Sequence, residues 1–441
     1  MPKFKVILTA LVLTAGILAA QTAPQKKPAR AAAAAAGKLQ RIKITGSSRY
    51  TPEQMLSFSG LHIGDTVENE NFKEVTQRLG ETGLFTDVAY SFTSSSSGIE
   101  VDFQLVDSKK LVPSEFENFV WFPDDDLRNR LRASVPLFQG ELPLDGTLVD
   151  TVGDALQAFL AFGGVENAKV DIMRHSAEED GPVDSIVYSV SGINVRIRSF
   201  EFPGAGEAEL PKLIDAAKRQ QGEEYLRSKL RILSRVDLMP VYLREGKLRA
   251  KFGDSQAKVV KQDKEEALVD AVIPVEEGRQ YKLGGLEWSG NKLFPTARLE
   301  PSVHLQPGQL VDAIQLKADL TKVNQIYRTK GYINASVDPQ VELDDTQGTA
   351  SYKLIVKEGD QYKMGELELV GLDDKTKVKA QEAWALREGE PYDGSYAKSY
   401  LKTLRDIFPP NLDWKMVVHE SVNEQDKTVD VTLHFTVDPA R

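Results

Sequence analysis

VKEGDQYKMGELELVG, residues 356–371, has a close echo in VEEGRQYKLGGLEWSG at residues 275–290 and a more divergent copy, VSGINVRIRSFEFPG, at residues 190–204. In each copy a glutamate between two apolar residues stands nine positions after the first glycine, and another glycine follows three positions later. The copies are about 80–90 residues apart, and a fixed period of this kind indicates one small folding unit duplicated into an array. Such arrays usually present binding surface and not a single catalytic pocket.

Composition limits the class of protein. The chain has 441 residues, of which 27% are charged and 41% are hydrophobic, as in soluble globular proteins. Its net charge of −10 argues against nucleic-acid binding, because neutralising phosphates requires clustered Lys and Arg. It has no cysteine, so an exported form folds without disulfides, and both cysteine-based zinc sites and a lipid-bearing N-terminal cysteine are excluded.

The N-terminus has the pattern of a secretory signal peptide. Lys3 and Lys5 precede an uncharged apolar run, residues 6–20, which ends in small residues. This run is short for a membrane span, which needs about 20 residues. The sequence therefore predicts a signal peptide at residues 1–20 and a flexible linker at 21–37, with an uncleaved membrane anchor as the alternative. No later segment resembles a transmembrane helix.

The first repeat can be followed element by element. Alternating apolar residues around Ile42 predict a short strand, and Pro52, between a threonine and a glutamate, is typical of a helix N-terminus. An apolar stripe through residues 72–79 predicts a second helix. Two alternating segments, residues 88–92 and 99–105, then predict two strands joined by a turn.

The same order of strand, helix, helix, strand and strand recurs along the chain, which predicts an α+β protein built as a tandem array. In the third repeat the charged residues 253–266 are interpreted as a long hairpin loop. The predicted repeats, numbered one to five, cover residues 38–107, 113–191, 192–277, 278–358 and 359–438.

The order of elements and the repeated Gly-x-x-aromatic pattern resemble POTRA domains, the periplasmic repeats of outer-membrane assembly factors of the BamA and TamA kind. The resemblance extends over about 400 residues; it is closest in repeats one, four and five and rests mainly on element order in two and three. It implies about five POTRA-like units, each a small sheet with two helices against one face. Members of that family normally continue into a membrane β-barrel, whereas here the last predicted strand ends near Val437, so an array without a membrane barrel is expected.

The sequence predicts no catalytic, cofactor-binding or metal-binding residues. The five histidines are scattered singly over the repeats. The acidic run Asp124–Asp126 is interpreted as a helix cap and not as a calcium loop, because no further ligands follow at alternating positions. Glu201, Glu287 and Glu368 recur within the repeated stretch and are predicted to point outward from the first strand, with a contact between repeats as the alternative.

The resemblance also implies where a repeat could bind a partner. In POTRA domains the second strand lies at the edge of the sheet, where unpaired N–H and C=O groups can pair with an extended segment. The alternative is that these edges are solvated or covered by neighbouring repeats. A proline at Val417 is expected to weaken such strand addition without unfolding the repeat. The candidate edges are residues 87–93, 335–342 and 413–419, with Val88, Tyr90, Phe92, Val337, Val341, Trp414, Met416 and Val418 as candidate binding residues.

These features favour a non-enzymatic periplasmic scaffold, associated with the outer membrane, that assists outer-membrane protein assembly. The expected partners are a separately encoded outer-membrane β-barrel protein or unfolded outer-membrane clients, with assembly lipoproteins as further candidates. Neither nucleic acid nor a cofactor is expected, and no segment is expected to span the membrane once the signal peptide is removed. The alternative function is a structural adaptor in another envelope complex, for secretion, division or lipid transport.

Overall fold

The computed structural model describes residues 36–178, 181–404, 407–408 and 413–438. The predicted signal peptide and nearly all of the predicted linker lie outside the described residues. The chain divides into two compact bodies, each of which is described by itself: Met1–Lys109 with Asp145–Thr147, and Lys110–Leu144 with Leu148–Arg441.

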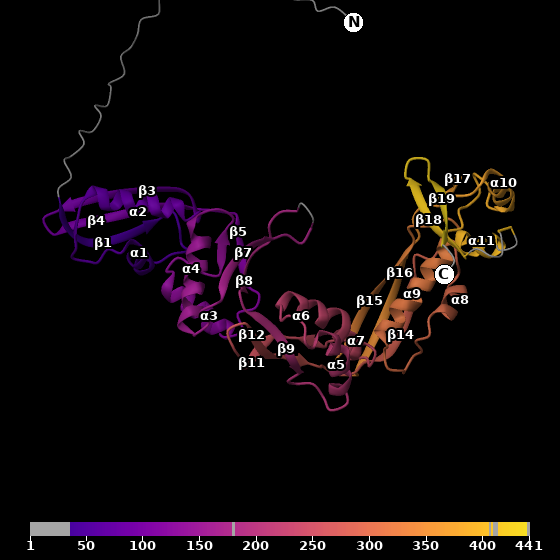
Figure 1. Cartoon of the computed structure of the whole chain (residues 1–441), viewed down its shortest axis with the longest axis horizontal. Helices are drawn as coiled ribbons and strands as arrows, with labels where there is room; N and C mark the ends of the chain where they lie inside the picture. Colours follow the sequence, from indigo (N-terminus) through magenta and orange to yellow (C-terminus); the bar gives the residue numbers. More distant parts are fainter. Residues whose placement is uncertain (1–35, 179–180, 405–406, 409–412, 439–441) are drawn as a thin grey trace, which may run out of the picture. The chain divides into compact units, whose positions relative to one another are not determined.

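Repeat one makes up the first body. Thr51 caps the first helix, since its hydroxyl oxygen accepts a hydrogen bond from Gln54 N, and Pro52 occupies the first helical position. The second helix buries Phe72 and Leu79. The predicted order of elements is therefore confirmed, with one additional short strand. The elements are β1 (Gly37–Thr45), α1 (Pro52–Ser59), β2 (Thr66–Val67), α2 (Asn69–Glu81), β3 (Phe85–Ser95) and β4 (Gly98–Asp107) (Figure 1).

The second body contains repeats two to five. Repeat two has β5 (Leu111–Phe116), α3 (Asp124–Ser134), β6 (Glu141–Pro143), α4 (Thr147–Phe162), β7 (Lys169–His175) and β8 (Ser185–Ser191). Repeat three has β9 (Asn194–Glu201), α5 (Leu210–Ala217), α6 (Arg227–Leu233), α7 (Met239–Leu243), β10 (Lys251–Phe252), β11 (Gln256–Gln262), β12 (Glu266–Val272) and β13 (Val275–Glu276). Repeat four has β14 (Lys282–Ser289), α8 (Thr296–Leu299), α9 (Ala313–Arg328), β15 (Ser336–Asp344) and β16 (Thr349–Lys357). Repeat five has β17 (Lys363–Val370), α10 (Asp374–Ala383), α11 (Tyr396–Leu404), β18 (Asp413–Asn423) and β19 (Thr428–Asp438).

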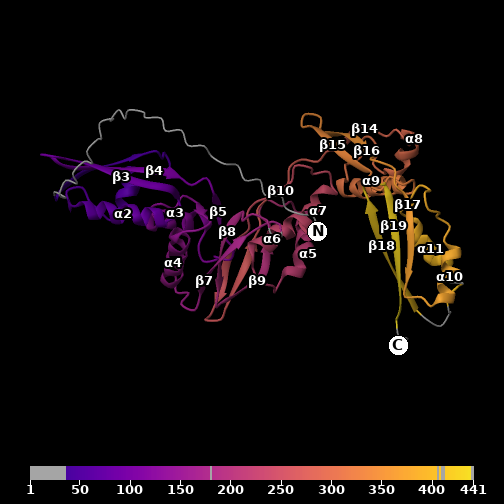
Figure 2. The same ribbon diagram turned by 90° about the horizontal axis from the view of Figure 1, so that it is seen from above.

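All five main sheets follow one plan. The first long strand of each repeat runs parallel to the last long strand, and the long strand before it pairs antiparallel with that last long strand on the outer side. In repeat five the helices α10 and α11 lie on one side of this sheet (Figure 2). The predicted tandem α+β array is confirmed, with the expected strand, helix, helix, strand and strand order in each repeat. The strand orders are β2-β1-β4-β3, β6-β5-β8-β7, β9-β12-β11, β14-β16-β15 and β17-β19-β18.

The interpretation of the charged stretch in repeat three as a long hairpin loop is wrong. Residues 253–266 contain β11, which pairs antiparallel with β12. Lys258 and Lys261 are exposed on this outer strand, so the alternation of buried and exposed residues that reveals other strands is missing here.

The recurring glycine that ends the repeated stretch has a physical cause. Gly371 has a φ of +88°, and a Cβ atom there would come within 2.1 Å of the main-chain oxygen of Phe435 in β19. Gly46, Gly204 and Gly290 occupy the same place in repeats one, three and four, with φ of +81°, +90° and +81° and a strand oxygen at 2.3, 2.2 and 2.2 Å. Both the left-handed backbone and the close approach require the absence of a side chain.

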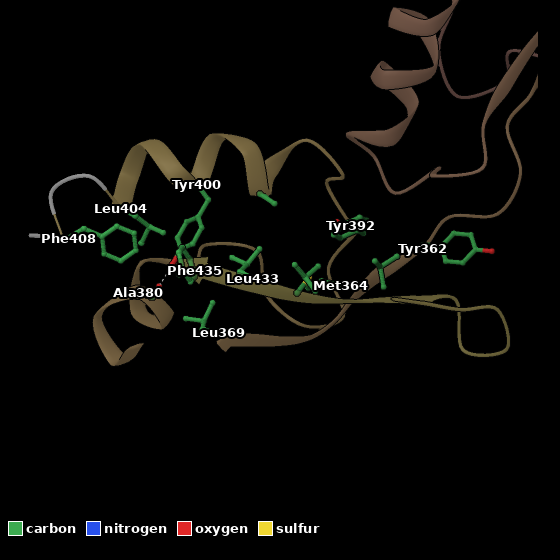
Figure 3. Packing of buried hydrophobic residues seen from close by; sticks show 13 residues of the cluster. Tyr362, Met364, Leu369, Ala380, Tyr392, Tyr400, Leu404, Phe408, Leu433 and Phe435 are labelled. Carbon is green, nitrogen blue, oxygen red and sulfur yellow. Dashed lines mark hydrogen bonds between the residues drawn. The ribbon is translucent and has the colours of Figure 1, made fainter. Parts of the chain in front are cut away.

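The core of repeat five lies between its helices and its sheet. Tyr400 and Leu404 of α11 pack toward Leu433 and Phe435 of β19, and the Tyr400 hydroxyl donates a hydrogen bond to the carbonyl oxygen of Ala380 in α10 (Figure 3). All five of these residues are buried. The apolar periods in the sequence thus correspond to helix stripes and strand faces that meet in one cluster.

The acidic run in repeat two lies at the start of α3, but it does not cap the helix. Pro123 is the N-cap residue, and Asp124 to Asp126 form the first turn, where negative charge is favourable. Asp124 forms an ion pair with Arg227, and Asp126 accepts a hydrogen bond of 2.8 Å from Arg130. Within the described ranges, no group of three or more metal-ligating side chains could hold a metal ion.

Two of the three recurring glutamates make contacts within their own repeats. Glu201 Oε2 lies 2.5 Å from Lys258 Nζ on β11, and Glu368 accepts a hydrogen bond of 3.4 Å from the Thr432 hydroxyl on β19. Glu287 is exposed. The prediction of an outward orientation is therefore consistent with all three positions.

Repeat three also contains a buried ionic cluster that the sequence did not reveal. Lys247 Nζ lies 2.5 Å from Glu209 Oε1 and 2.8 Å from Glu277 Oε2, and the exposed fractions of Lys247 and Glu209 are 8% and 5%. Glu277 also accepts hydrogen bonds from Gly206 N at 2.5 Å and from the Tyr242 hydroxyl at 3.2 Å. The cluster joins the segment before α5, the segment after α7 and the segment after β13.

Candidate strand-binding edges

The three predicted edge segments lie on outer strands. β3, β15 and β18 each stand at one end of their sheet, with a single neighbouring strand. This placement follows from the shared topology, in which the last strand of a repeat is central and the strand before it is outermost.

The side chains of most candidate binding residues face the cores. In repeat one, the Phe72 ring of α2 lies 6.1 Å from the Tyr90 ring and 5.5 Å from the Phe92 ring. The Tyr90 hydroxyl lies 2.9 Å from Asn69 Oδ1. In repeat five the partly buried Trp414, Met416 and Val418 pack against the cluster of Figure 3.

The two candidates in repeat four differ from each other. Val337 is partly buried and packs against the core, whereas the exposed fraction of Val341 is 46%. Apart from Val341 and Phe92, which is 37% exposed, the candidate side chains are at least partly buried. Binding through these residues would therefore involve their main chain more than their side chains.

The register of β18 decides where its main-chain groups point. Lys427 O accepts a hydrogen bond of 2.9 Å from Lys363 N, and Phe435 O lies against Gly371, so odd-numbered residues of β19 direct their polar groups toward β17. Successive residues of a strand alternate in this direction, so even-numbered residues of β19 bond to β18. Because His434 pairs with Val417, the odd-numbered residues of β18 bond to β19. Trp414, Met416 and Val418 therefore direct their N–H and C=O groups away from the sheet.

The same argument applies to the other two edges. Leu105 O lies against Gly46 and Val356 O against Gly290, which orients the central strands β4 and β16. With the observed registers, the outward-facing residues of β3 and β15 include the remaining candidates, which are Val88, Tyr90, Phe92, Val337 and Val341. Along a strand, side chains and main-chain polar groups both change sides at every residue. The residues of an outer strand whose side chains face the core therefore all direct their N–H and C=O groups to the same side of that strand.

The expectation for a proline at Val417 is corrected by this geometry. Val417 belongs to the odd-numbered set of β18, whose N–H groups bond to β19. Proline there would remove a hydrogen bond inside the sheet, and the neighbouring Val418 is the residue whose N–H points outward.

One end of β18 is held by polar contacts. Glu420 accepts a hydrogen bond of 2.8 Å from Arg328 Nη2 of α9 and another of 2.8 Å from the Tyr392 hydroxyl. Burial, together with the hydrogen bond to Glu420, raises the pKa of Tyr392, so its hydroxyl keeps the proton that it donates. A strand fixed in this way has less conformational freedom to lose when a partner binds.

Two further outer strands were not among the predicted edges. β7 and β11 occupy the outer positions in repeats two and three. In β7 only Val170 and Ile172 are partly buried, and β11 is almost wholly exposed. The alternation that marks a strand in the sequence is therefore weak in both.

In the part of the chain that the structure describes, no helix is both long and apolar enough to span a membrane.

Comparison with known proteins identifies the family that two segments of the chain match. It also identifies two related proteins. The POTRA family model, described as a surface antigen variable number repeat, matches residues 37–107 and 281–359. The chain is 23% identical over 195 residues to a putative outer membrane protein assembly factor of Treponema pallidum, a match that covers 44% of this chain and 23% of the relative. It is 21% identical over 213 residues to the outer membrane protein assembly factor BamA of Neisseria meningitidis serogroup B, covering 45% of this chain and 26% of the relative.

The chain therefore contains POTRA repeats, and it spans about a quarter of the length of these curated relatives. Among solved structures, it is similar to POTRA domains 3–5 of BamA from Haemophilus influenzae, with 18% identity and a TM-score of 0.42. That match covers 55% of this chain and 95% of the solved one.

Proposed function

We propose that this protein is a non-catalytic periplasmic scaffold that binds extended polypeptide segments by strand addition and assists outer-membrane protein assembly. The observation that carries the proposal is the outer side of β18, where Trp414, Met416, Val418, Glu420 and Val422 direct their main-chain groups outward. In the described part of the chain, none of their N–H groups has a hydrogen-bond partner. The names of the two curated relatives, both assembly factors, support the same role.

The energetics favour weak and sequence-tolerant binding at a single edge. Each added main-chain hydrogen bond contributes about 0.5–1.5 kcal/mol net. Ordering the added strand costs about 1–2 kcal/mol per residue, which is as large as that gain or larger. A single edge therefore binds transiently, and a segment that engages two edges of one chain gains through the effective concentration of the second site.

This chemistry suits partners that present extended strands. Main-chain pairing needs little side-chain identity, so many unfolded outer-membrane proteins, or an exposed strand of a separately encoded β-barrel protein, could bind in the same way. Assembly lipoproteins remain further candidate partners. The export pattern at residues 1–20 is consistent with a periplasmic location at the outer membrane.

Replacing Val418 by proline should weaken strand addition at repeat five by about threefold to tenfold. The substitution removes one outward N–H group while leaving the bonds between β18 and β19 intact, and one lost hydrogen bond has an effect of this size. The matched control is Val418→Thr, which keeps both the N–H group and a β-branched side chain.

The absence of cysteine allows a site-specific measurement. A cysteine placed at Ser421, which is exposed and bonds inward to β19, would stand in a close, non-hydrogen-bonded pair with an added strand, at a spacing that suits a disulfide. The probe is an alternating Val/Thr peptide of about ten residues whose central cysteine is supplied as a mixed disulfide with free cysteine. The thiolate of the chain attacks the peptide sulfur, and free cysteine leaves as the thiol. Equal trapping rates in the Val418→Pro and Val418→Thr backgrounds would contradict the proposed mechanism.

Co-purification separates the assembly role from that of an adaptor. The exported chain should recover a β-barrel protein or unfolded outer-membrane clients. Recovery of a secretion, division or lipid-transport complex in their place would favour the adaptor.

A further inference from the structure

We propose that strand addition is confined to β3 and β18, because the outer strands of the other three repeats are closed, and that Pro339 closes repeat four. This inference rests on the proposed function and specifies which edges of the array perform it.

The edge of repeat four is interrupted at its centre. Pro339 pairs with Leu354 in the register of β15 and β16, and it belongs to the set of residues that point away from the sheet. Proline has no N–H group, so an added strand would find no donor at this position and would meet the pyrrolidine ring. Because residue 339 points outward, the proline breaks no bond of the sheet itself, which explains how a strand of nine residues accommodates it.

The edge of repeat two is occupied by a side chain of the same repeat. Val170 belongs to the outward-facing set of β7, and its N–H donates a hydrogen bond of 2.9 Å to Gln157 Oε1 of α4. Gln157 Nε2 in turn donates a hydrogen bond of 2.8 Å to Ala168 O. The amide of Gln157 thus takes the place that an added strand would need at the start of β7.

The edge of repeat three is distorted and charged. The register of β11 shifts between Val259 and Lys261, which marks a bulge that turns the main-chain groups out of line. Lys258 and Lys261 flank the bulge, and Lys258 pairs with Glu201. Bulges and lysines on an outer strand both discourage pairing with another chain.

The two remaining edges, β3 and β18, have no proline, no bound side chain and no bulge at several consecutive outward-facing positions. The outward-facing residues of β3 after its irregular start are Val88, Tyr90, Phe92 and Ser94, and among the described residues their N–H groups have no hydrogen-bond partner. The corresponding set in β18 is also free of proline and of a register shift. The open edges therefore belong to the first and last repeats, with three closed repeats between them in the chain.

Disulfide trapping with the Val/Thr peptide tests the role of Pro339. Gln340 is exposed and bonds inward to β16, so Gln340→Cys is the repeat-four counterpart of Ser421→Cys. The full-length chain is used, and each rate is divided by the rate of the same cysteine with free cystine, which corrects for thiol exposure and pKa. A peptide with the same side chains but N-methylated main-chain amides measures trapping without strand addition.

The expected result is rapid trapping at Ser421→Cys, trapping at Gln340→Cys no faster than with the N-methylated peptide, and a gain of about threefold to tenfold when Pro339→Val is added to Gln340→Cys. Pro339→Ala restores the same N–H group and serves as a second variant if Pro339→Val lowers the melting temperature.

Two results would overturn the inference while the proposed function stands. One is trapping at Gln340→Cys as fast as at Ser421→Cys with Pro339 in place. The other is the absence of any gain from both proline replacements in chains that melt like the parent. Failure of Ser421→Cys itself to exceed the N-methylated control would instead reject strand addition, and the inference would fall with it.

Discussion

Replacing Lys247 by methionine should lower the free energy of unfolding of repeat three by about 3–5 kcal/mol. The substitution keeps an unbranched apolar stem of similar shape but removes the ammonium group, which leaves Glu209 and Glu277 buried together without their shared cation. Removing one partner of a buried ion pair costs more than the pair contributes, because the remaining charges stay desolvated. Urea titration with hydrogen exchange of the repeat-three amides measures the change for this repeat alone.

The control lies on the surface of the same repeat. Lys212 pairs with Glu245, and its side chain is 51% exposed. Lys212→Met removes a cation from a solvated pair, so it should change the free energy of unfolding by less than about 1 kcal/mol. Equal effects of the two substitutions would show that the buried cluster does not stabilise the repeat.

The effect of Lys247→Met should diminish as the pH falls. Burial opposes ionisation of Glu277, but its bond to Lys247 and the N–H of Gly206 outweigh this, so its pKa is held below the usual 4.5. In the native protein this contributes stability that is present above pH of about 4.5 and is lost as the pH falls through the lowered pKa. In the variant the uncompensated carboxylates gain stability on protonation, so the difference between the two proteins should be smaller near pH 4 than at pH 7. An unchanged difference would contradict the electrostatic explanation.

Replacing Gly371 by alanine should destabilise repeat five by about 2–5 kcal/mol. A left-handed backbone costs a residue with a side chain about 1–2 kcal/mol, and forced overlap in a packed region costs about 1–3 kcal/mol more. The overlap arises because the alanine methyl group would lie 2.1 Å from Phe435 O. Both residues directly follow Val370 and His434, the last pair of the parallel register between β17 and β19.

Gly389 provides a matched control in the same repeat. Its φ is +82°, close to the +88° of Gly371, but a Cβ atom there would have no heavy atom within 4 Å. Gly389→Ala should therefore cost only the backbone part, about 1–2 kcal/mol. Urea unfolding followed by the fluorescence of Trp384 and Trp414 compares the two variants. A Gly371→Ala chain as stable as Gly389→Ala would mean that the strand oxygen is not a constraint.

The order of elements in a repeat could be predicted because local sequence carries it. The stripe from Phe72 to Leu79 and the alternation in β19 each recur with the period of one helix or one strand, and burial on one face is enough to impose such a period. β11 could not be predicted for the same reason. It is an outer strand with lysines and has no buried face, so its sequence has only a weak alternation of apolar and polar residues. The buried charge of Lys247 gave no local signal either, since its partners lie 38 and 30 positions away.

The repeated α+β unit, its number of copies and the glycine that ends each repeated stretch can be predicted from the amino-acid order, because they depend on short-range periods and on one residue type that alone tolerates the backbone. The three-dimensional fold was needed to show which main-chain groups face outward, why Val418 and not Val417 is exposed for pairing, and why Pro339 closes its edge. These properties depend on the register between strands, and a shift of one residue in that register exchanges the inner and outer sides of a strand.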